Sequence, residues 1–269
     1  MDSVVASLRA AGCVYAEDEG AILCQAARAP GELAAMLARR VAGYPLEHIV
    51  GWAQFHGMRI VVDRGVFVPR RRTEFLVGRA LEILRAKHPS HRIEGATAGQ
   101  PPRRLVVVDL CCGSGAVGAA LAHGVDGLEL HAADIDPAAV ACAAKNLNNV
   151  NGHAYCGDLF DAVPKNLRGT VDMVVANAPY VPTEEIAFMP EEARVHEPDA
   201  ALNGGADGLD IQRRIAAQAP AWLRPGGCLL LETSARQAAV SAGIMAACGF
   251  SAEIGHCEEL DGTVVTGVY

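Results

Sequence analysis

The feature that most constrains the fold is the alternation of short apolar segments with helical segments after residue 104. Apolar runs occur in RRLVVVDL, LELHAAD, HAYCGD, VDMVVAN and GGCLLLET, and TVVTGVY closes the chain. Short apolar strands that alternate with helices form a mostly parallel sheet, because the helical connections cover both of its faces. The pattern predicts an α/β fold, and we expect the two final strands to form a hairpin.

The first 104 residues follow other patterns. Residues 1–50 are rich in Ala, Leu and Arg, with apolar positions at helical spacing, and Gly43 ends the last helical stretch. Residues 51–85 combine alternating, hairpin-like segments with a connecting helix. Residues 86–104 contain Pro, Gly, His and Arg without periodicity and are predicted to be a linker. The α/β domain is predicted to span residues 105–269.

Charge, cysteine content and hydropathy limit the partners that we expect. The formal net charge is −8, whereas a protein that binds duplex DNA through its phosphates is usually basic. The nine cysteines include no Cys-x-x-Cys pair, so we expect reduced thiols and no metal site. The N-terminus lacks a signal pattern, and no apolar run reaches the roughly 18 residues of a membrane span. These observations predict a cytoplasmic protein without a duplex DNA or membrane partner.

A glycine-rich loop follows the first apolar strand, in VVVDLCCGSGAVG. Gly113, Ser114 and Gly115 lie between this strand and the next helix, where missing side chains let a ligand approach the backbone. Asp134 ends the next strand about twenty residues later, where a carboxylate can accept hydrogen bonds from both hydroxyls of a ribose. Asp158 ends the third strand. These positions predict a nucleotide site at the ends of the strands.

The loop alone leaves two types of cofactor open. The spacing Gly113-x-Gly115-x-x-Gly118 satisfies the pattern of dinucleotide-binding enzymes, which hold a pyrophosphate at the helix N-terminus. Asp109 favours S-adenosylmethionine instead, because an acid repels phosphate and suits the ammonium and sulfonium groups of this cofactor. A further interpretation gives Asp109 only the role of capping the following helix.

With Asn177-Ala-Pro-Tyr180 added, the chain resembles the HemK-type protein-glutamine N5-methyltransferases, which modify peptide-chain release factors. The resemblance runs from about Arg39 to the end. It is carried by RRVAGYPLEHIVGWAQFHGMRIVVDRGVFVPRRRTEFLV, VVDLCCGSGAVGAALA, AADIDPAAVACAAKN, CGDLFDAVP, HEPDAALNGGADGLDIQRRI and LRPGGCLLLETSARQ. It implies a Rossmann-like, seven-stranded class I methyltransferase fold over residues 105–269. It also implies that the small helical N-terminal region, residues 1–50, recognises the protein substrate.

The resemblance further implies a set of site residues. S-adenosylmethionine is the implied cofactor, with Asp134 as the ribose ligand and Leu159 beside the adenine. The residues implied at the cofactor are Asp109, Cys111, Cys112, Gly113, Ser114, Gly115, Asp134, Asp158, Leu159 and Asn177. Those implied at the methyl acceptor are Asn177, Ala178, Pro179 and Tyr180.

Methyl transfer to an amide gives a chemical reason for an asparagine at the tip of a strand. An amide nitrogen is a weak nucleophile, because its lone pair is delocalised into the carbonyl. The Asn177 side-chain oxygen and the backbone carbonyl of Ala178 can accept hydrogen bonds from its two N–H groups, and Tyr180 can stack on the planar amide. The alternative is that Asn177 only stabilises a turn by bonding nearby backbone.

The chain departs from the family pattern at several positions. Ala178 stands where a proline is usual, Arg71 and Arg72 replace a proline and a glutamate, and Cys111 stands where a glycine is usual. The helical N-terminal region is shorter than usual, and the final DGTVVTGVY lacks an arginine. Two other functions therefore stay open: an N-methyltransferase that acts on a nucleobase amine or a small molecule, and an S-adenosylmethionine-binding module without activity.

Overall fold

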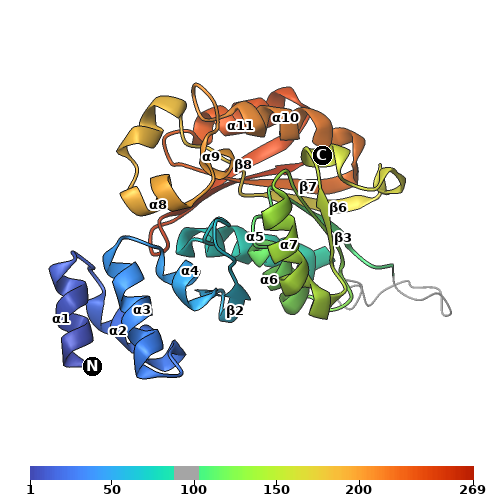
Figure 1. Cartoon of the computed structure of the whole chain (residues 1–269). Coiled ribbons are helices and arrows are strands. Elements are labelled where there is room, and N and C mark those ends of the chain that lie inside the picture. The colour runs from blue at the N-terminus through green and yellow to red at the C-terminus, as the bar shows by residue number, and fades with distance from the viewer. Residues whose placement is uncertain (88–102) are drawn as a thin grey trace.

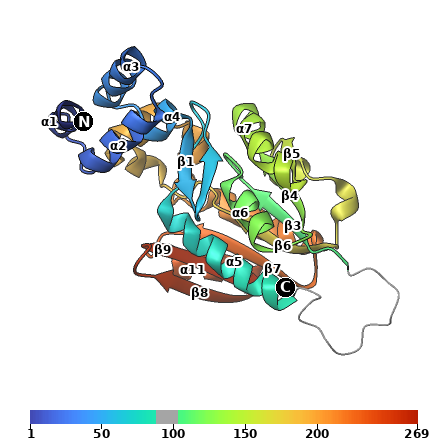
Figure 2. The ribbon, with the colours of Figure 1, turned by 90° about the horizontal axis from the view of Figure 1, so that it is seen from below.

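The computed structural model describes residues 1–87 and 103–269 (Figure 1). Most of the linker predicted over residues 86–104 lies outside the described residues. The described residues form an α/β domain, with a group of helices from the N-terminal region at one side of it (Figures 1 and 2). None of the described helices is both long and apolar enough to cross a membrane.

A seven-stranded sheet forms the centre of the α/β domain, in the order β5-β4-β3-β6-β7-β9-β8. The strands from β5 to β7 in this order pair in parallel, and β9 is antiparallel to both β7 and β8. Their bounds are β3 (Val106–Leu110), β4 (Glu129–Asp134), β5 (His153–Cys156), β6 (Val171–Ala176), β7 (Leu223–Thr233), β8 (Ser251–Cys257) and β9 (Gly262–Val268). The sheet confirms the α/β class predicted from the alternating pattern and the seven-stranded fold implied by the resemblance.

The last two strands, β8 and β9, form a hairpin at one edge of the sheet. The hairpin expected from the sequence joined GGCLLLET to TVVTGVY instead. These segments belong to β7 and β9, which pair in antiparallel register but are separated in the chain by α11 and β8. β8 pairs along its whole length with β9 in antiparallel register, from Ser251 opposite Val268 to Cys257 opposite Gly262. The apolar segments of the sequence did not reveal β8. Its sequence, SAEIGHC, lacks an apolar run because most of this edge strand is exposed or half-buried. A strand at an edge packs on fewer neighbours, so its composition gives a weaker signal.

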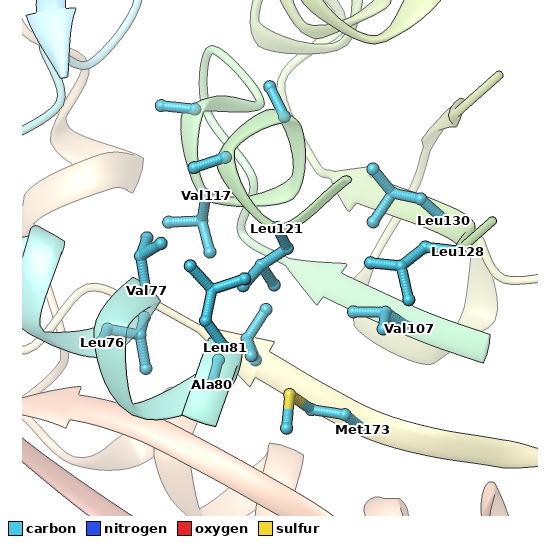
Figure 3. Packing of buried hydrophobic residues seen from close by; sticks show 14 of the residues in the cluster. Leu76, Val77, Ala80, Leu81, Val107, Val117, Leu121, Leu128, Leu130 and Met173 are labelled. Carbon is cyan, nitrogen blue, oxygen red and sulfur yellow. The ribbon is translucent and has the colours of Figure 1, made fainter. Parts of the chain in front are cut away.

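Helices cover both faces of the sheet (Figure 2). On one face, Figure 3 shows Leu76 and Val77 of α5 packing towards Leu121 of α6, with Val107 and Met173 contributed by the strands. Each fully buried leucine of this kind stabilises the fold by about 1.5–3 kcal/mol. The helices of this face are α5 (Glu74–Lys87), α6 (Ala116–Gly124) and α7 (Pro137–Leu147), and those of the other face are α10 (Asp210–Gln218) and α11 (Ala238–Ala247).

The N-terminal region has a small core of its own. Val4, Leu8, Leu23 and Ile49 form a buried apolar cluster that is separate from the cores of the α/β domain. The elements of this region are α1 (Asp2–Ala10), α2 (Ala16–Ala26), α3 (Pro30–Val41) and α4 (Leu46–Val50), followed by the antiparallel hairpin of β1 (Trp52–Phe55) and β2 (Met58–Val61). Short 3-10 helices cover Arg71–Thr73 (η1), Asn148–Val150 (η3), Leu159–Asp161 (η4), Lys165–Leu167 (η5), Thr183–Phe188 (η6) and Ala219–Ala221 (η7).

Two contacts join the N-terminal helices to the segment that follows β6. Arg40 of α3 forms ion pairs with Glu19, at 2.6 Å, and with Glu192 of α8 (Glu191–His196), at 3.1 Å. The ring of Tyr44 stacks on that of His196, with 4.3 Å between centroids. Sequence spacing gives His196 no partner, because Tyr44 approaches it only through the tertiary fold. A second short helix, α9 (Asp199–Leu202), continues this segment.

Candidate active site

A cavity of about 250 Å³ lies at the carboxyl ends of the parallel strands. Ligands of open α/β sheets bind at this edge. The residues that the sequence assigned to the site and that line the cavity are Asp109, Cys111, Cys112, Gly113, Ser114, Asp134, Asp158, Leu159, Asn177 and Pro179. Gly115, Ala178 and Tyr180 do not line it. The cavity wall also includes Phe67, Thr73, Ile135, Asn203 and Arg214, which the sequence did not point to.

The loop between β3 and α6 depends on left-handed backbone conformations. The φ angles are +54° at Gly113 and +75° at Gly115, values that glycine adopts without steric cost. Gly115 also begins α6 at a close approach, since a Cβ there would lie 3.0 Å from the Cβ of Ala143 in α7. Cys111 has a φ of +55° although it carries a side chain. This conformation explains why glycine suits position 111 and why the cysteine is strained.

The strain at Cys111 leads to a stability prediction. A left-handed conformation costs a residue with a side chain about 1–2 kcal/mol. We therefore expect Cys111→Gly to be more stable than Cys111→Ala by about 1 kcal/mol, as measured by urea unfolding. Cys156, an exposed residue of β5 without a positive φ, is the control. There we expect the order to reverse, because glycine weakens a strand relative to alanine. Equal stability of the two Cys111 variants would contradict the strain.

Asp109 is a buried acid at the base of the cavity, with 2% of its surface exposed. Its Oδ2 accepts a hydrogen bond of 2.9 Å from the backbone N–H of Gly118, near the start of α6. A Cβ on Gly118 would lie 3.1 Å from this oxygen, so glycine makes room for the carboxylate. Burial raises the pKa of Asp109 to about 7, and the charge of Asp134 adds to the rise, whereas the Gly118 N–H opposes it. The helix-capping contact is present, and the same side chain lines the cavity.

Asp134 organises the loops around the cavity. Its Oδ2 accepts a hydrogen bond of 2.8 Å from the backbone N–H of Gly113, and its Oδ1 accepts one of 3.0 Å from that of Asp136. Asp136 in turn caps α7 through its side chain. Burial raises the pKa of Asp134, and the two backbone N–H groups oppose that rise. One carboxylate thus fixes both the glycine loop and the start of the next helix.

An ion pair that the sequence did not reveal lies at the edge of the cavity. Arg214 of α10 contacts Asp158 with 2.6 Å between Nη2 and Oδ2. Leu159, the next residue, is buried and has a φ of +49°. Ile135 also lines the cavity, although its side chain is 59% exposed in the structure. An exposed isoleucine in a cavity wall offers an apolar surface on which a flat ring can pack.

The 3-10 helix η1 and the segment after β6 form one end of the cavity, which we call the acceptor side after the hydrogen-bond acceptors that it contains. The Nδ2 of Asn177 donates a hydrogen bond of 3.1 Å to the Oγ1 of Thr73. This bond turns the Asn177 amide so that its Oδ1 accepts no hydrogen bond from any described residue. The backbone carbonyl of Ala178 accepts none from the described residues either. Two free acceptors therefore stand next to each other in the chain at this end of the site.

Tyr180 was expected to stack on a substrate amide, but its hydroxyl contacts a buried glutamate. Its hydroxyl donates to the Oε1 of Glu232 over 3.3 Å. Burial raises the pKa of Tyr180 to about 12, and the nearby charge of Glu232 adds to this. Because Tyr180 does not line the cavity, stacking of its ring on a substrate amide stays a prediction.

Comparisons with known proteins show the family to which the chain belongs. A family model described as "Methyltransferase small domain" matches residues 99–261. The release factor glutamine methyltransferase of Streptomyces coelicolor is 39% identical over 197 residues, which are 73% of this chain and 65% of that protein. The one of Geobacter sulfurreducens is 34% identical over 226 residues, 82% of this chain and 72% of that protein. The chain belongs to the HemK-type protein-glutamine methyltransferase family.

A solved structure supports the fold of this family member. The ribosomal protein L11 methylase of Lactobacillus delbrueckii subsp. bulgaricus superposes with a TM-score of 0.50 and 16% identity, over 77% of this chain and 82% of that one. At this identity the likeness concerns the fold alone. It is a methyltransferase fold, as the strand order of the central sheet also indicates.

The charges of the cavity fit S-adenosylmethionine, the cofactor of this family. Four aspartates line the cavity, Asp109, Asp134, Asp136 and Asp158, whereas Arg214 is the one cation among the described lining residues. Arg214 is already paired with Asp158. Such a wall repels a pyrophosphate and attracts a ligand that carries an ammonium and a sulfonium group. The cavity thus favours S-adenosylmethionine over the dinucleotide that the glycine pattern alone left open.

The raised pKa of Asp109 leads to a prediction for cofactor affinity. The ionised carboxylate attracts the cationic cofactor, and the fraction ionised falls about tenfold between pH 8 and pH 6 for a pKa of about 7. We therefore compare the affinities of the wild type and of Asp109→Asn for S-adenosylmethionine by calorimetry. The ratio of the wild-type affinity to the variant affinity should fall by about tenfold as the pH is lowered from 8 to 6. The amine of the cofactor also titrates, but it does so equally for both proteins, so its effect cancels in the ratio of the two affinities. A ratio that stays constant would contradict this role of Asp109.

The raised pKa of Asp109 also makes the free energy of unfolding depend on pH. The pKa of Asp109 in the folded chain lies above the ordinary value of 3.8, so the unfolded chain loses this proton first. The stability that Asp109 contributes is therefore complete below about pH 4 and is lost as the pH rises through 7. A bound cation offsets this loss, because it stabilises the ionised carboxylate.

Proposed function

We propose that this protein transfers a methyl group from S-adenosylmethionine to the side-chain amide nitrogen of a glutamine in a peptide-chain release factor or a related protein. The observation that carries the proposal is the orientation of Asn177. Thr73 holds the NH₂ group of its amide, and the oxygen is left free beside the free carbonyl of Ala178. The relatives named above as release factor glutamine methyltransferases support the substrate class.

Two acceptors are what an amide substrate needs. S-adenosylmethionine supplies the methyl group on a sulfonium, which is a good leaving group. The side-chain oxygen of Asn177 and the carbonyl of Ala178 would accept the two N–H bonds of the glutamine amide and orient its nitrogen. Both hydrogen bonds would strengthen as positive charge develops on the nitrogen in the transition state. The nitrogen–carbon bond would form as the sulfur–carbon bond breaks and S-adenosylhomocysteine leaves, and the methylated nitrogen would lose one proton to solvent. The protein therefore has to position a weak nucleophile, at about 3–3.5 Å from the methyl carbon, and needs no strong base for the transfer.

Alanine at position 178 is compatible with this mechanism. The acceptor is a backbone carbonyl, which any residue supplies. Ala178 is buried, with 1% of its surface exposed, and it precedes Pro179, which disfavours helical backbone angles at position 178. The family usually has a proline at this position. Its ring would stabilise the folded state by about 0.4–1 kcal/mol, because it lowers the conformational entropy of the unfolded chain.

We assign recognition of the release factor to the helical N-terminal region, residues 1–50, and to the segment that follows β6. The contacts of Arg40 with Glu192 and of Tyr44 with His196 support this assignment, because they hold the two parts together next to the acceptor side. Release factors act in the cytoplasm, so we place the protein there. The net charge of −8 supports a protein substrate over duplex DNA.

The first experiment identifies the methyl acceptor. Candidate release factors are incubated with the protein and isotopically labelled S-adenosylmethionine, and their tryptic peptides are analysed by mass spectrometry. We expect one labelled methyl group on a glutamine side chain. Label on a nucleic acid or a small molecule, with none on the release factors, would support the nucleobase or small-molecule alternative. Cofactor binding without any transfer would indicate a binding module without activity.

Asn177 variants test the mechanism in the same assay. We expect Asn177→Ala to lower kcat by about 10²–10³-fold, because the transition state loses one of two acceptors. Affinity for S-adenosylmethionine should change little, since Asp109, Asp134 and Asp158 stay in place. Asn177→Asp keeps an acceptor and adds a negative charge near the sulfonium, so it should retain part of the activity or bind the cofactor more tightly.

Asn166→Ala is the matched control for these variants. Asn166 is an exposed residue of η5 that does not line the cavity, and its replacement should leave kcat unchanged. A near-normal rate for Asn177→Ala would instead mean that Asn177 only stabilises a turn.

A further inference from the structure

Glu232 is a buried acid that neither the sequence nor the mechanism above has used. It lies in β7, in the run LLLET, and 1% of its surface is exposed. Its Oε2 has no hydrogen-bond partner of good geometry among the described residues, and it is the one buried side-chain oxygen or nitrogen of that part of the chain in this condition. A buried carboxylate destabilises the fold unless it is fully paired. A buried acid with an unpaired oxygen does not stabilise the strand, so we looked for a functional role of Glu232.

The groups around Glu232 come from the two segments that form the acceptor side of the site. The hydroxyl of Tyr180 donates to Oε1 over 3.3 Å. Burial raises the pKa of Glu232 to about 7, while hydrogen bonding from Thr73, the charge of Arg72 and the Tyr180 hydroxyl oppose the rise. Arg72 and Thr73 belong to η1, and Tyr180 follows Asn177 in the chain. Glu232 thus lies where these segments meet.

The hydrogen-bond directions around Thr73 connect Glu232 to Asn177. The Thr73 Oγ1 accepts a hydrogen bond from the Nδ2 of Asn177, so its own hydrogen is free to be donated elsewhere. No described residue accepts that hydrogen in a hydrogen bond of good geometry, and Thr73 and the unpaired Oε2 of Glu232 are both buried where these segments meet. Donation of that hydrogen to the unpaired Oε2 of Glu232 would complete a chain of donors from Asn177 to Thr73 to Glu232. Above its pKa of about 7 the Glu232 carboxylate is ionised and can only accept, so it then fixes this direction.

We infer that Glu232 is a positioning residue for methyl transfer: by accepting the hydroxyl proton of Thr73, it makes Thr73 an acceptor for the Asn177 NH₂ group and so turns the Asn177 oxygen towards the substrate. The effect of Glu232 on catalysis rests on the proposed function, whereas its effect on the orientation of the Asn177 amide does not. The opposite orientation of the Asn177 amide would present N–H donors to the N–H groups of the substrate. Such a pairing of donors gives no acceptor for the charge that develops on the nitrogen.

The kinetic test uses variants of Glu232 and Thr73. Glu232→Gln keeps the size of the side chain but offers donors as well as an acceptor, so the direction of the chain is no longer fixed. We expect kcat to fall by about 10²-fold with little change in KM or in cofactor affinity. Thr73→Ser keeps the hydroxyl and should retain most of the activity. Thr73→Val has the same shape without the hydroxyl and should behave like Glu232→Gln. Equal activity of the serine and valine variants would overturn the inference.

A second readout does not depend on activity. The side-chain NH₂ protons of Asn177, assigned by NMR through Asn177→Ala, should exchange slowly in the wild type because one of them is bonded to Thr73. In Glu232→Gln and Thr73→Val this protection should be lost. Protection that persists in Glu232→Gln would refute the positioning role even if the protein has another substrate. Absence of methylation by the wild type, with the NMR effects present, would contradict the proposed function instead.

Asp172→Asn is the matched control for this readout. Asp172 is also a buried acid, 2% exposed, and lies near the other end of β6, where it forms ion pairs with Arg103 and Arg224. Its replacement by an amide should lower stability, because two arginines lose their partner. The protection of the Asn177 amide should stay as in the wild type. Loss of protection in this variant too would show that the signal reports general loosening, and the inference would fall.

Discussion

The site depends on the parallel pairing of β3 with its two neighbours. Leu110 at the end of β3 lies opposite Ala133 of β4 and opposite Ala176 of β6. The next residues along the three strands are Cys111, Asp134 and Asn177, so this register brings the glycine loop, the acid at the loop and the acceptor asparagine to one edge. In a parallel sheet all strands end at the same edge, and a shift of one residue would point these side chains to the opposite face. In the proposed mechanism, the methyl donor and the methyl acceptor can therefore meet only if this register holds.

Two buried acids stand on the two sides of this edge, and both have a pKa of about 7 for the same reason, namely burial. Asp109 is held by a backbone N–H of α6 and lines the cavity on the cofactor side. Glu232 does not line the cavity and lies next to Thr73 and Tyr180 on the acceptor side. Strongly shifted pKa values cluster at functional sites, where burial and neighbouring charges adjust acids and bases to their roles. Asp109 would balance the charge of a cationic ligand, whereas Glu232 would set the direction of hydrogen bonds.

Three of the departures from the family pattern fall into two groups with different consequences. Cys111 and Ala178 change how easily the backbone adopts its conformation, and the group that the proposed mechanism uses at position 178 is a backbone carbonyl. Arg72 changes the electrostatics instead, because its charge helps to keep Glu232 ionised and lowers the pKa of Tyr180. The cofactor side is thus close to the family pattern in its chemistry, and the acceptor side carries the change that alters a charge.

The sequence by itself determined the α/β class, the cofactor loop and the position of Asn177, because these depend on local patterns: apolar runs that end in an acid or an amide, and glycines at left-handed positions. It missed β8, an edge strand without an apolar run, and it missed every partner that is distant in the chain. Asn177 and Thr73 are 104 residues apart, Arg214 and Asp158 are 56 apart, and Tyr180 and Glu232 are 52 apart. Only the tertiary structure decided these pairs. A side chain's partner across the fold depends on how strands and helices pack, and a single sequence carries no periodic signal for that distance.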